Sequence, residues 1–110
     1  MMTPDEQASL ERIRSQAAAG AVRISLHAHA AMADESFRLD DVLQALASDS
    51  AEIIENYPAH RRGPCCLVNS KTGGGRAVHV VCTTAQPALI LITVYEPLPP
   101  KWVTPRQRGR

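Results

Sequence analysis

The sequence predicts an α+β fold in which helices pack on one face of an antiparallel sheet. Helical patterns dominate the first 48 residues, and β-like segments joined by short loops fill most of the rest. A length of 110 residues is typical of one domain, and a composition of 45% hydrophobic and 21% charged residues is that of an ordinary globular protein. We therefore expect a single domain over residues 1–110, with an N-terminal helix at 1–20, an α+β core at 21–96 and a basic, proline-rich arm at 97–110.

Capping residues predict the first helix. Thr3 suits the N-cap position, Pro4 suits the first helical position, and Glu6 completes a capping box with Thr3. Gly20 is suited to end the helix because glycine adopts positive φ without strain. The apolar face of the helix consists of Leu10, Ile13 and Ala17.

A short strand and two short helices are expected next. Residues 21–26 alternate apolar and polar side chains, which is the period of a half-buried strand. Residues 27–35 and 39–48 have helical periodicity instead. Asp40 and Asp41 fall in the first turn of the second of these helices, where the helix dipole favours negative charge.

The remaining segments predict an antiparallel meander of four strands, at residues 51–57, 65–70, 76–84 and 88–95. The loops between them are too short for crossover connections. The last segment is apolar on both faces, so we expect it to be a central strand. The glycines from Gly73 to Gly75 are interpreted as a hairpin turn, because no Lys-Ser or Lys-Thr pair follows as a phosphate loop requires.

The loop between the last two strands fixes their register. If Thr84 to Pro87 form a symmetric four-residue loop, Arg76 lies opposite Tyr95, and His79 points to the other face of the sheet. A register change of one residue would reverse that orientation.

The C-terminal arm contains four prolines: Pro97, Pro99, Pro100 and Pro105. Because proline has no backbone N–H, we expect the arm to continue neither a ladder nor a helix. It should run extended over the surface. Trp102 is the residue expected to anchor it.

Charge is divided unevenly between the two parts of the chain. Residues 1–60 carry four arginines against ten acidic residues, a net charge of −6, and residues 61–110 carry eight basic residues against one glutamate, a net charge of +7. Such asymmetry suggests a face that could meet a polyanion, although charge runs are usually only solvated surface. The cations expected to contact phosphate are Arg61, Arg62, Arg76, Lys101 and Arg106.

Three cysteines, Cys65, Cys66 and Cys82, indicate free buried thiols, because an odd count with two adjacent members is a poor disulfide framework. Neighbours on a strand point to opposite faces, so no zinc site is expected, and no other cofactor is implied. No apolar stretch approaches the roughly 20 residues that span a bilayer, and the N-terminus lacks a signal-peptide pattern. We expect a cytoplasmic protein that does not enter a membrane.

His27, His79 and Tyr95 are the candidate catalytic residues. His27 lies where a strand gives way to a helix, and it serves either as a capping and packing residue or in a site. His79 lies inside an apolar strand, where an imidazole is either a hydrogen-bonded core residue or an acid–base group. Tyr95 ends a strand, as a packing residue or as part of the same site.

Five segments, ISLHAHAAM, LDDVLQAL, EIIENYPAHRRGPCCL, GRAVHVVCTT and LITVYEPLPPKW, resemble a family of small bacterial proteins described only as a domain of unknown function. Members of that family are similar to toxins of the RelE and MqsR type and are often encoded beside a YgiT-type zinc-finger antitoxin. The resemblance implies a RelE-like core over residues 21–96, messenger RNA as substrate and an antitoxin protein as partner. The positions that match residues marked in the family are His27, Asp41, Glu55, Tyr57, His79, Tyr95, Glu96, Pro97 and Trp102.

Many relatives have arginines in the first of the two short helices, where this chain has Ala31 and Glu35. Phosphate binding would then fall to Arg61, Arg62, Arg76 and the arm.

Two functions follow as hypotheses. The first is a metal-independent endoribonuclease toxin acting on mRNA, free or ribosome-bound, in which cations gather around at least one imidazole. His27 and His79 would transfer protons and Tyr95 would assist. The second is a non-catalytic interaction module in which the aromatic residues and the arm bind a partner protein. The sequence leaves a homodimer open.

Overall fold

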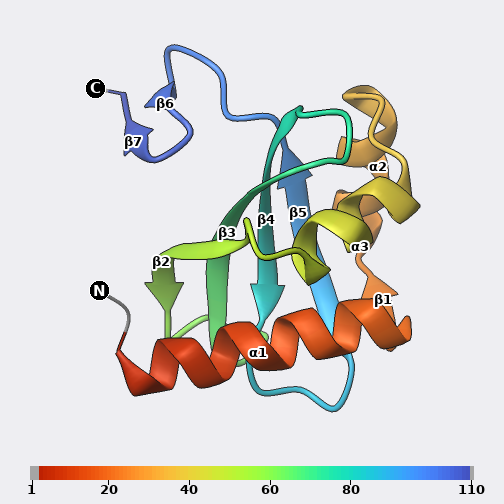
Figure 1. The fold of residues 1–110 in the computed structure, drawn as a ribbon, viewed down its shortest axis with the longest axis vertical. Helices are drawn as coiled ribbons and strands as arrows, with labels where there is room; N and C mark the ends of the chain where they lie inside the picture. Colours follow the sequence, from red (N-terminus) through yellow and green to blue (C-terminus); the bar gives the residue numbers. More distant parts are fainter. Residues whose placement is uncertain (1–2, 110) are drawn as a thin grey trace.

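The structure is a computed structural model that describes residues 3–109, and it has the α+β architecture expected from the sequence (Figure 1). The helices are α1 (Pro4–Ala19), α2 (Leu26–Asp34) and α3 (Leu39–Ala47). The strands are β1 (Val22–Ile24), β2 (Glu52–Tyr57), β3 (Cys65–Lys71), β4 (Ala77–Thr83), β5 (Leu89–Tyr95), β6 (Trp102–Thr104) and β7 (Gln107–Arg108).

The predicted caps of α1 are confirmed. The Thr3 side chain accepts a hydrogen bond from the Glu6 backbone N–H, and the Glu6 side chain accepts one from the Thr3 backbone N–H. Gly20 ends the helix in the left-handed region, with φ of 69°. Helix α2 begins in a similar way, because the hydroxyl of Ser25 accepts a hydrogen bond from the N–H of Ala28.

The main sheet has the strand order β1-β5-β4-β3-β2. Strands β2 to β5 form the predicted antiparallel meander. Strand β1 pairs with β5 in the parallel direction, so the complete sheet is mixed. Strand β5 therefore lies between β1 and β4, which confirms its predicted interior position.

One face of the main sheet is covered by α1, α2 and α3. Buried apolar residues of all three helices belong to one core with inward-facing residues of the strands. Val78 and Val80 of β4 belong to this core, together with Leu89 and Leu91 of β5. Since side chains alternate along a strand, His79 must point to the opposite face.

The predicted register of β4 and β5 is wrong. His79, and not Arg76, lies opposite Tyr95. The connection spans five residues, 84–88, and β5 contains a bulge, because Val81 pairs with Thr93 whereas Cys82 pairs with Leu91. The bulge leaves Ile92 without an opposite residue and shifts the register beyond it. Consequently His79 and Tyr95 share the face away from the helices.

The predicted extended arm is also wrong, because residues 102–108 fold back on themselves. Strands β6 and β7 pair as a small antiparallel hairpin, which we call the C-terminal hairpin (residues 101–109). The four prolines lie outside its paired segments, with Pro105 in the turn, so they remove no ladder hydrogen bond. Trp102 is buried, with 2% of its surface exposed, which confirms its predicted anchoring role.

The C-terminal hairpin lies near β2 and α2 lies near β5, on different sides of the molecule (Figure 1). Other predicted local features are also present. The turn at residues 72–76 is closed by hydrogen bonds from the Thr72 N–H to the Arg76 carbonyl and from the Gly75 N–H to the Thr72 carbonyl. Gly75 has φ of 86°, which favours glycine.

Candidate functional site

The buried imidazole of His79 lies between two aromatic rings on the face of the sheet away from the helices. Its ring centroid lies 5.2 Å from that of Tyr95 and 4.4 Å from that of Trp102, both in edge-to-face geometry. The side chain of His79 has no exposed surface. Strands β4, β5 and β6 thus each supply one ring to the same cluster.

Two hydrogen bonds fix the tautomer of His79. Its Nε2 lies 2.7 Å from the carbonyl oxygen of Pro105, and its Nδ1 lies 3.2 Å from the hydroxyl of Tyr95. A carbonyl oxygen can only accept, so Nε2 carries the hydrogen. In the neutral ring Nδ1 is then an acceptor, and the Tyr95 hydroxyl donates to it.

Burial keeps the imidazole in that neutral form. Desolvation lowers the pKa of His79 and outweighs the hydrogen bond to Pro105, which acts in the opposite direction. Desolvation also raises the pKa of Tyr95. The pair is therefore uncharged near pH 7, with one proton held between Tyr95 and Nδ1.

A carboxylate, a phenol and a guanidinium adjoin these rings. Arg108 donates to both carboxylate oxygens of Glu55, at 2.6 and 2.7 Å, and its guanidinium lies 4.7 Å from the centroid of the Trp102 ring. The Tyr57 hydroxyl donates a hydrogen bond to Glu55. The Arg108 hydrogen bonds lower the pKa of Glu55, whereas desolvation and the contact with Glu55 raise the pKa of Tyr57 to about 12. We call these six residues the His79 cluster: Glu55, Tyr57, His79, Tyr95, Trp102 and Arg108.

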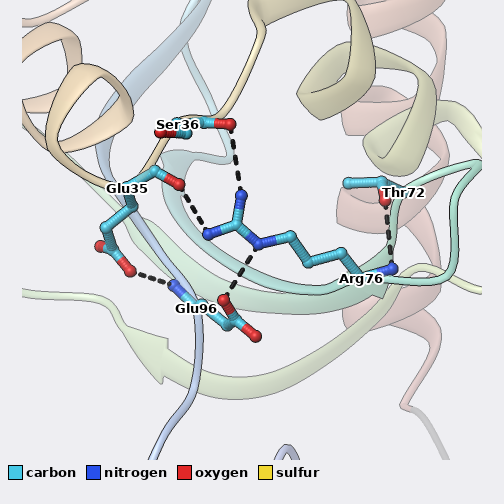
Figure 2. Close-up of polar contacts among 5 residues, drawn as sticks. All are labelled: Glu35, Ser36, Thr72, Arg76 and Glu96. Carbon is cyan, nitrogen blue, oxygen red and sulfur yellow. Dashed lines mark hydrogen bonds and ion pairs between the residues drawn. The ribbon is translucent and has the colours of Figure 1, made fainter.

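Arg76 lies in a different arrangement, at the start of β4 (Figure 2). Its Nε donates to the Glu96 carboxylate at 3.0 Å, and its two terminal nitrogens donate to the carbonyls of Glu35 and Ser36 at 2.6 and 3.3 Å. The guanidinium also stacks 3.8 Å from the centroid of the Phe37 ring. All three nitrogens of Arg76 thus have partners within the chain, which tie β4 to the segment after α2.

The structure separates the two predicted histidines. His79 lies in the cluster, whereas His27 is exposed in the first turn of α2, among helices that cover the other face of the sheet. Tyr95 lies beside His79 as a site requires. Of the three catalytic residues predicted from the sequence, the structure therefore brings two, His79 and Tyr95, together in one cluster.

The predicted phosphate-binding residues do not converge. Arg61 and Arg62 are exposed between β2 and β3, where the Arg62 carbonyl accepts from Gln86, at the end of the sheet away from Asn69 and His79. Lys101 is exposed at the start of the C-terminal hairpin, and Arg106 pairs with Glu52 at 2.6 Å. Cations from the basic part of the chain thus pair with acids from the acidic part, which the net charges alone did not reveal.

Sequence reasoning left four members of the cluster out of the site: Glu55, Tyr57, Arg108, and Trp102, which was expected only to anchor the arm. Glu55 and Tyr57 are two residues apart on β2, so they share a face, and both match marked positions of the resembling family. The spacing of two residues was the signal in the sequence that could have placed Glu55 and Tyr57 in the same site. Arg108 had no comparable signal, because its place depends on the fold of the C-terminal hairpin.

The three cysteines are buried and free, as expected. Cys66 and Cys82 are directly opposite on β3 and β4, and the hydrogen bond between them, together with burial, raises the pKa of Cys82. Within residues 3–109, no group of three or more His, Cys, Asp or Glu side chains is placed to hold a metal ion. None of the helices in this range combines the length and the apolar character needed to cross a membrane.

Comparison with known proteins identifies one family. The family model described as "Domain of unknown function (DUF4258)" matches residues 24–96, which include α2, α3 and β2 to β5 and begin at the last residue of β1. No curated protein and no solved structure matches the chain. The match covers four members of the His79 cluster and ends before the C-terminal hairpin that carries Trp102 and Arg108.

Proposed function

The chain belongs to the DUF4258 family of domains of unknown function, and on this premise we propose that it is a metal-independent endoribonuclease that cleaves mRNA, the toxin of a toxin–antitoxin pair. The observation that supports this most is the His79 cluster. It combines an imidazole hydrogen-bonded to a phenol with a guanidinium and a second phenol, on one face of one sheet. These are the groups that RNA transesterification uses for proton transfer and charge stabilisation.

In the proposed reaction, His79 and Tyr95 accept the proton of the ribose 2′-hydroxyl. The Tyr95 oxygen takes this proton as its own proton passes to Nδ1 of His79, so tyrosine stays neutral and the imidazole becomes a cation. The Pro105 carbonyl, or water in its place, accepts from Nε2–H and stabilises that cation. The 2′-oxygen attacks phosphorus, and the bond from phosphorus to the 5′-oxygen breaks to leave a 2′,3′-cyclic phosphate.

Tyr57 and Arg108 serve the leaving group and the phosphorane. A phenol with a pKa of about 12 keeps its proton at neutral pH and can donate it to the departing 5′-oxygen. When the C-terminal hairpin has closed again over the substrate, the Arg108 guanidinium, held by Glu55, supplies positive charge within the same cluster. Trp102 offers a ring on which a base can stack.

Substrate access requires the C-terminal hairpin to move. His79 has no exposed surface, and the hairpin turn accepts its Nε2–H. The hairpin is tethered by the Arg106–Glu52 and Arg108–Glu55 pairs, whose arginines are 74% and 51% exposed. Exposed pairs of this kind contribute about 1 kcal/mol or less each, so most of the cost of opening lies in exposing Trp102 and in breaking the hydrogen bond to Pro105.

The test is RNA cleavage by the purified full-length protein in excess EDTA. We expect products with 2′,3′-cyclic phosphate ends, and growth arrest when the protein is induced without an inhibitor. His79→Gln should lower the cleavage rate at least about 100-fold, and Tyr95→Phe should lower it by a similar factor. His29→Gln, on the exposed surface of α2, is the matched histidine control.

Two results would contradict the proposal. One is a folded wild-type protein that neither cleaves RNA, with or without ribosomes, nor arrests growth. The other is a His79→Gln variant as active as His29→Gln. His27→Gln separates the sequence hypothesis from the structural one, because only the sequence hypothesis expects it to lose activity.

A second candidate function is a non-catalytic module that binds a partner protein. The observation that favours it is apolar exposure beside the cluster: Leu98 and Val103 are 53% and 62% exposed, next to prolines of the arm. A YgiT-type zinc-finger protein is the partner proposed on the family resemblance. Co-expression with the product of the neighbouring reading frame, followed by copurification, tests this, and Leu98→Ser with Val103→Ser should abolish copurification.

A further inference from the structure

A polar groove adjoins the His79 cluster and is not part of it. The groove has a volume of about 430 Å³, and its walls are formed by the end of β3 and the C-terminal hairpin. Such a volume lies within the range of small-molecule sites, about 300–1,000 Å³. The lining residues are Asn69, Lys71, Thr104, Pro105 and Arg106. Pro105 is shared, because its carbonyl also accepts from His79.

The side chain of Asn69 holds an acceptor without a partner. Asn69 is 9% exposed, and its Nδ2 donates to the Glu52 carboxylate at 2.9 Å. Because that carboxylate can only accept, the amide cannot be turned around, and Oδ1 must face away from it. Among the described residues, Oδ1 has no hydrogen-bond donor. Oδ1 has less than 1 Å² of exposed surface, so a donor in the groove reaches it only when the hairpin turn at Pro105 shifts, a movement that substrate access already requires.

The charges around the groove suit a phosphate. Lys71 is exposed at its rim, and Arg106 uses only its Nε to contact Glu52. Two cations against one carboxylate leave a net charge of +1. None of the described residues that line the groove is aromatic, so these residues offer no stacking surface for a base. A sugar with its phosphate fits these walls better than a base does.

We propose that this groove binds one ribose-phosphate unit of an RNA strand, with the 2′-hydroxyl donating to Asn69 Oδ1 and the phosphate lying between Lys71 and Arg106. The inference rests on the proposed function, since it places a neighbouring nucleotide of the substrate beside the reacting one. It goes beyond that function by assigning the distinction between RNA and DNA to Asn69, because only RNA has the 2′-hydroxyl.

The test uses adenosine 5′-monophosphate and its 2′-deoxy analogue, which have no internucleotide bond to cleave. Binding is followed by NMR titration of the full-length protein, through the amides of Lys71 and Thr104. We expect the wild type to bind the ribonucleotide about five- to tenfold more tightly than the deoxyribonucleotide. Asn69→Leu should remove this preference and leave the deoxyribonucleotide affinity within about twofold.

Lys71→Gln provides a second variant that does not disturb a buried group. It should weaken both nucleotides about threefold or more, because it removes a phosphate contact that is independent of the sugar. Arg38→Gln is the control, since it removes one exposed charge before α3, away from the groove. If Asn69→Leu does not fold, the wild-type preference and the Lys71→Gln result decide the matter.

Three results would overturn the inference: equal affinity of the wild type for the two nucleotides, an unchanged preference in folded Asn69→Leu, or Lys71→Gln that binds as Arg38→Gln does. Failure of the proposed function is distinguishable. If the protein prefers the ribonucleotide through Asn69 but cleaves no RNA, the groove assignment stands and the proposed catalytic function is wrong. A protein that cleaves RNA but binds both nucleotides alike loses only the groove.

Discussion

The two faces of the main sheet are stabilised in different ways. The helix face is a continuous apolar core in which Val78 and Val80 of β4 pack with residues of all three helices. The opposite face, on which the C-terminal hairpin packs, contains the intervening residue, His79. There the hairpin and the strands are joined by hydrogen bonds, ring contacts and exposed ion pairs. One strand therefore serves both faces. Apolar burial contributes most of the folding free energy, so the polar face can carry reactive groups.

The difference also predicts which face opens first. Elements tied by few apolar contacts and exposed pairs unfold locally at low free energy. Trp102 is the one large buried apolar side chain of the C-terminal hairpin, among the described residues. We therefore expect the C-terminal hairpin to detach before any helix does.

The largest effect on stability is expected from shortening a buried side chain in the core between the helices and the sheet. Leu46→Ala removes a fully buried side chain of α3 and should lower the free energy of unfolding by about 2–5 kcal/mol. Leu98→Ala, on the exposed arm, should change it by less than about 0.5 kcal/mol. Urea denaturation measures both. Similar losses for the two variants would contradict the contrast between the faces.

A smaller effect is expected at the two arginine clusters. Arg76→Ala leaves the Glu96 carboxylate and two carbonyls without their donor and should destabilise the protein by about 2 kcal/mol. Arg108→Ala breaks an exposed pair and should lose about 1 kcal/mol or less. A double-mutant cycle of Arg76 with Glu96 measures the coupling in the first cluster. If Arg76→Ala and Arg108→Ala lower the free energy of unfolding equally, the difference in burial between the two arginines does not determine their contribution to stability.

The pH dependence of stability should report on His79. Burial lowers the pKa of His79 in the folded protein below its ordinary value of 6.5. As the pH falls below about 6.5, His79 takes up a proton in the unfolded chain but stays neutral in the folded chain, which favours unfolding. The free energy of unfolding therefore falls between about pH 6.5 and the lower pKa that His79 has in the folded protein. The slope cannot exceed one proton, about 1.4 kcal/mol per pH unit.

Urea denaturation between about pH 7.5 and 5.5 tests this dependence. The range stays above the ordinary value of 4.5 for Glu52 and Glu55, whose pKa values are lowered, so their contribution is constant there. For Glu52, desolvation acts in the opposite direction and is outweighed by the Asn69 and Arg106 hydrogen bonds. His79→Gln should flatten the profile. A slope that survives in His79→Gln would assign it to other groups.

The smallest effect is expected from salt. The Arg106–Glu52 and Arg108–Glu55 pairs are exposed, so raising ionic strength should weaken the attachment of the C-terminal hairpin by a few tenths of a kcal/mol. Limited proteolysis should then cut within residues 101–109 faster, while the helices stay protected. A hairpin equally protected at low and high salt would mean that Trp102 alone holds it.

Local signals in the sequence determined the elements themselves. The Thr3–Glu6 capping box, the Gly20 end of α1, the turn at Gly73–Gly75 and the meander of four strands all followed from residue types and spacing. These features depend on hydrogen bonds and backbone preferences within a few residues, which is the range that a sequence pattern describes. Trp102, the single tryptophan of the chain, was expected to anchor the basic, proline-rich arm, and it is buried.

Only the tertiary structure decided which residues meet. The bulge at Ile92 moved His79 to the position opposite Tyr95, and the C-terminal hairpin brought Arg108 from the last strand to Glu55 of β2. A one-residue change of register reverses the face of every later side chain, and a proline-rich segment says where pairing is forbidden but not where the chain returns. The elements are set by short-range preferences, whereas the site depends on register and long-range packing.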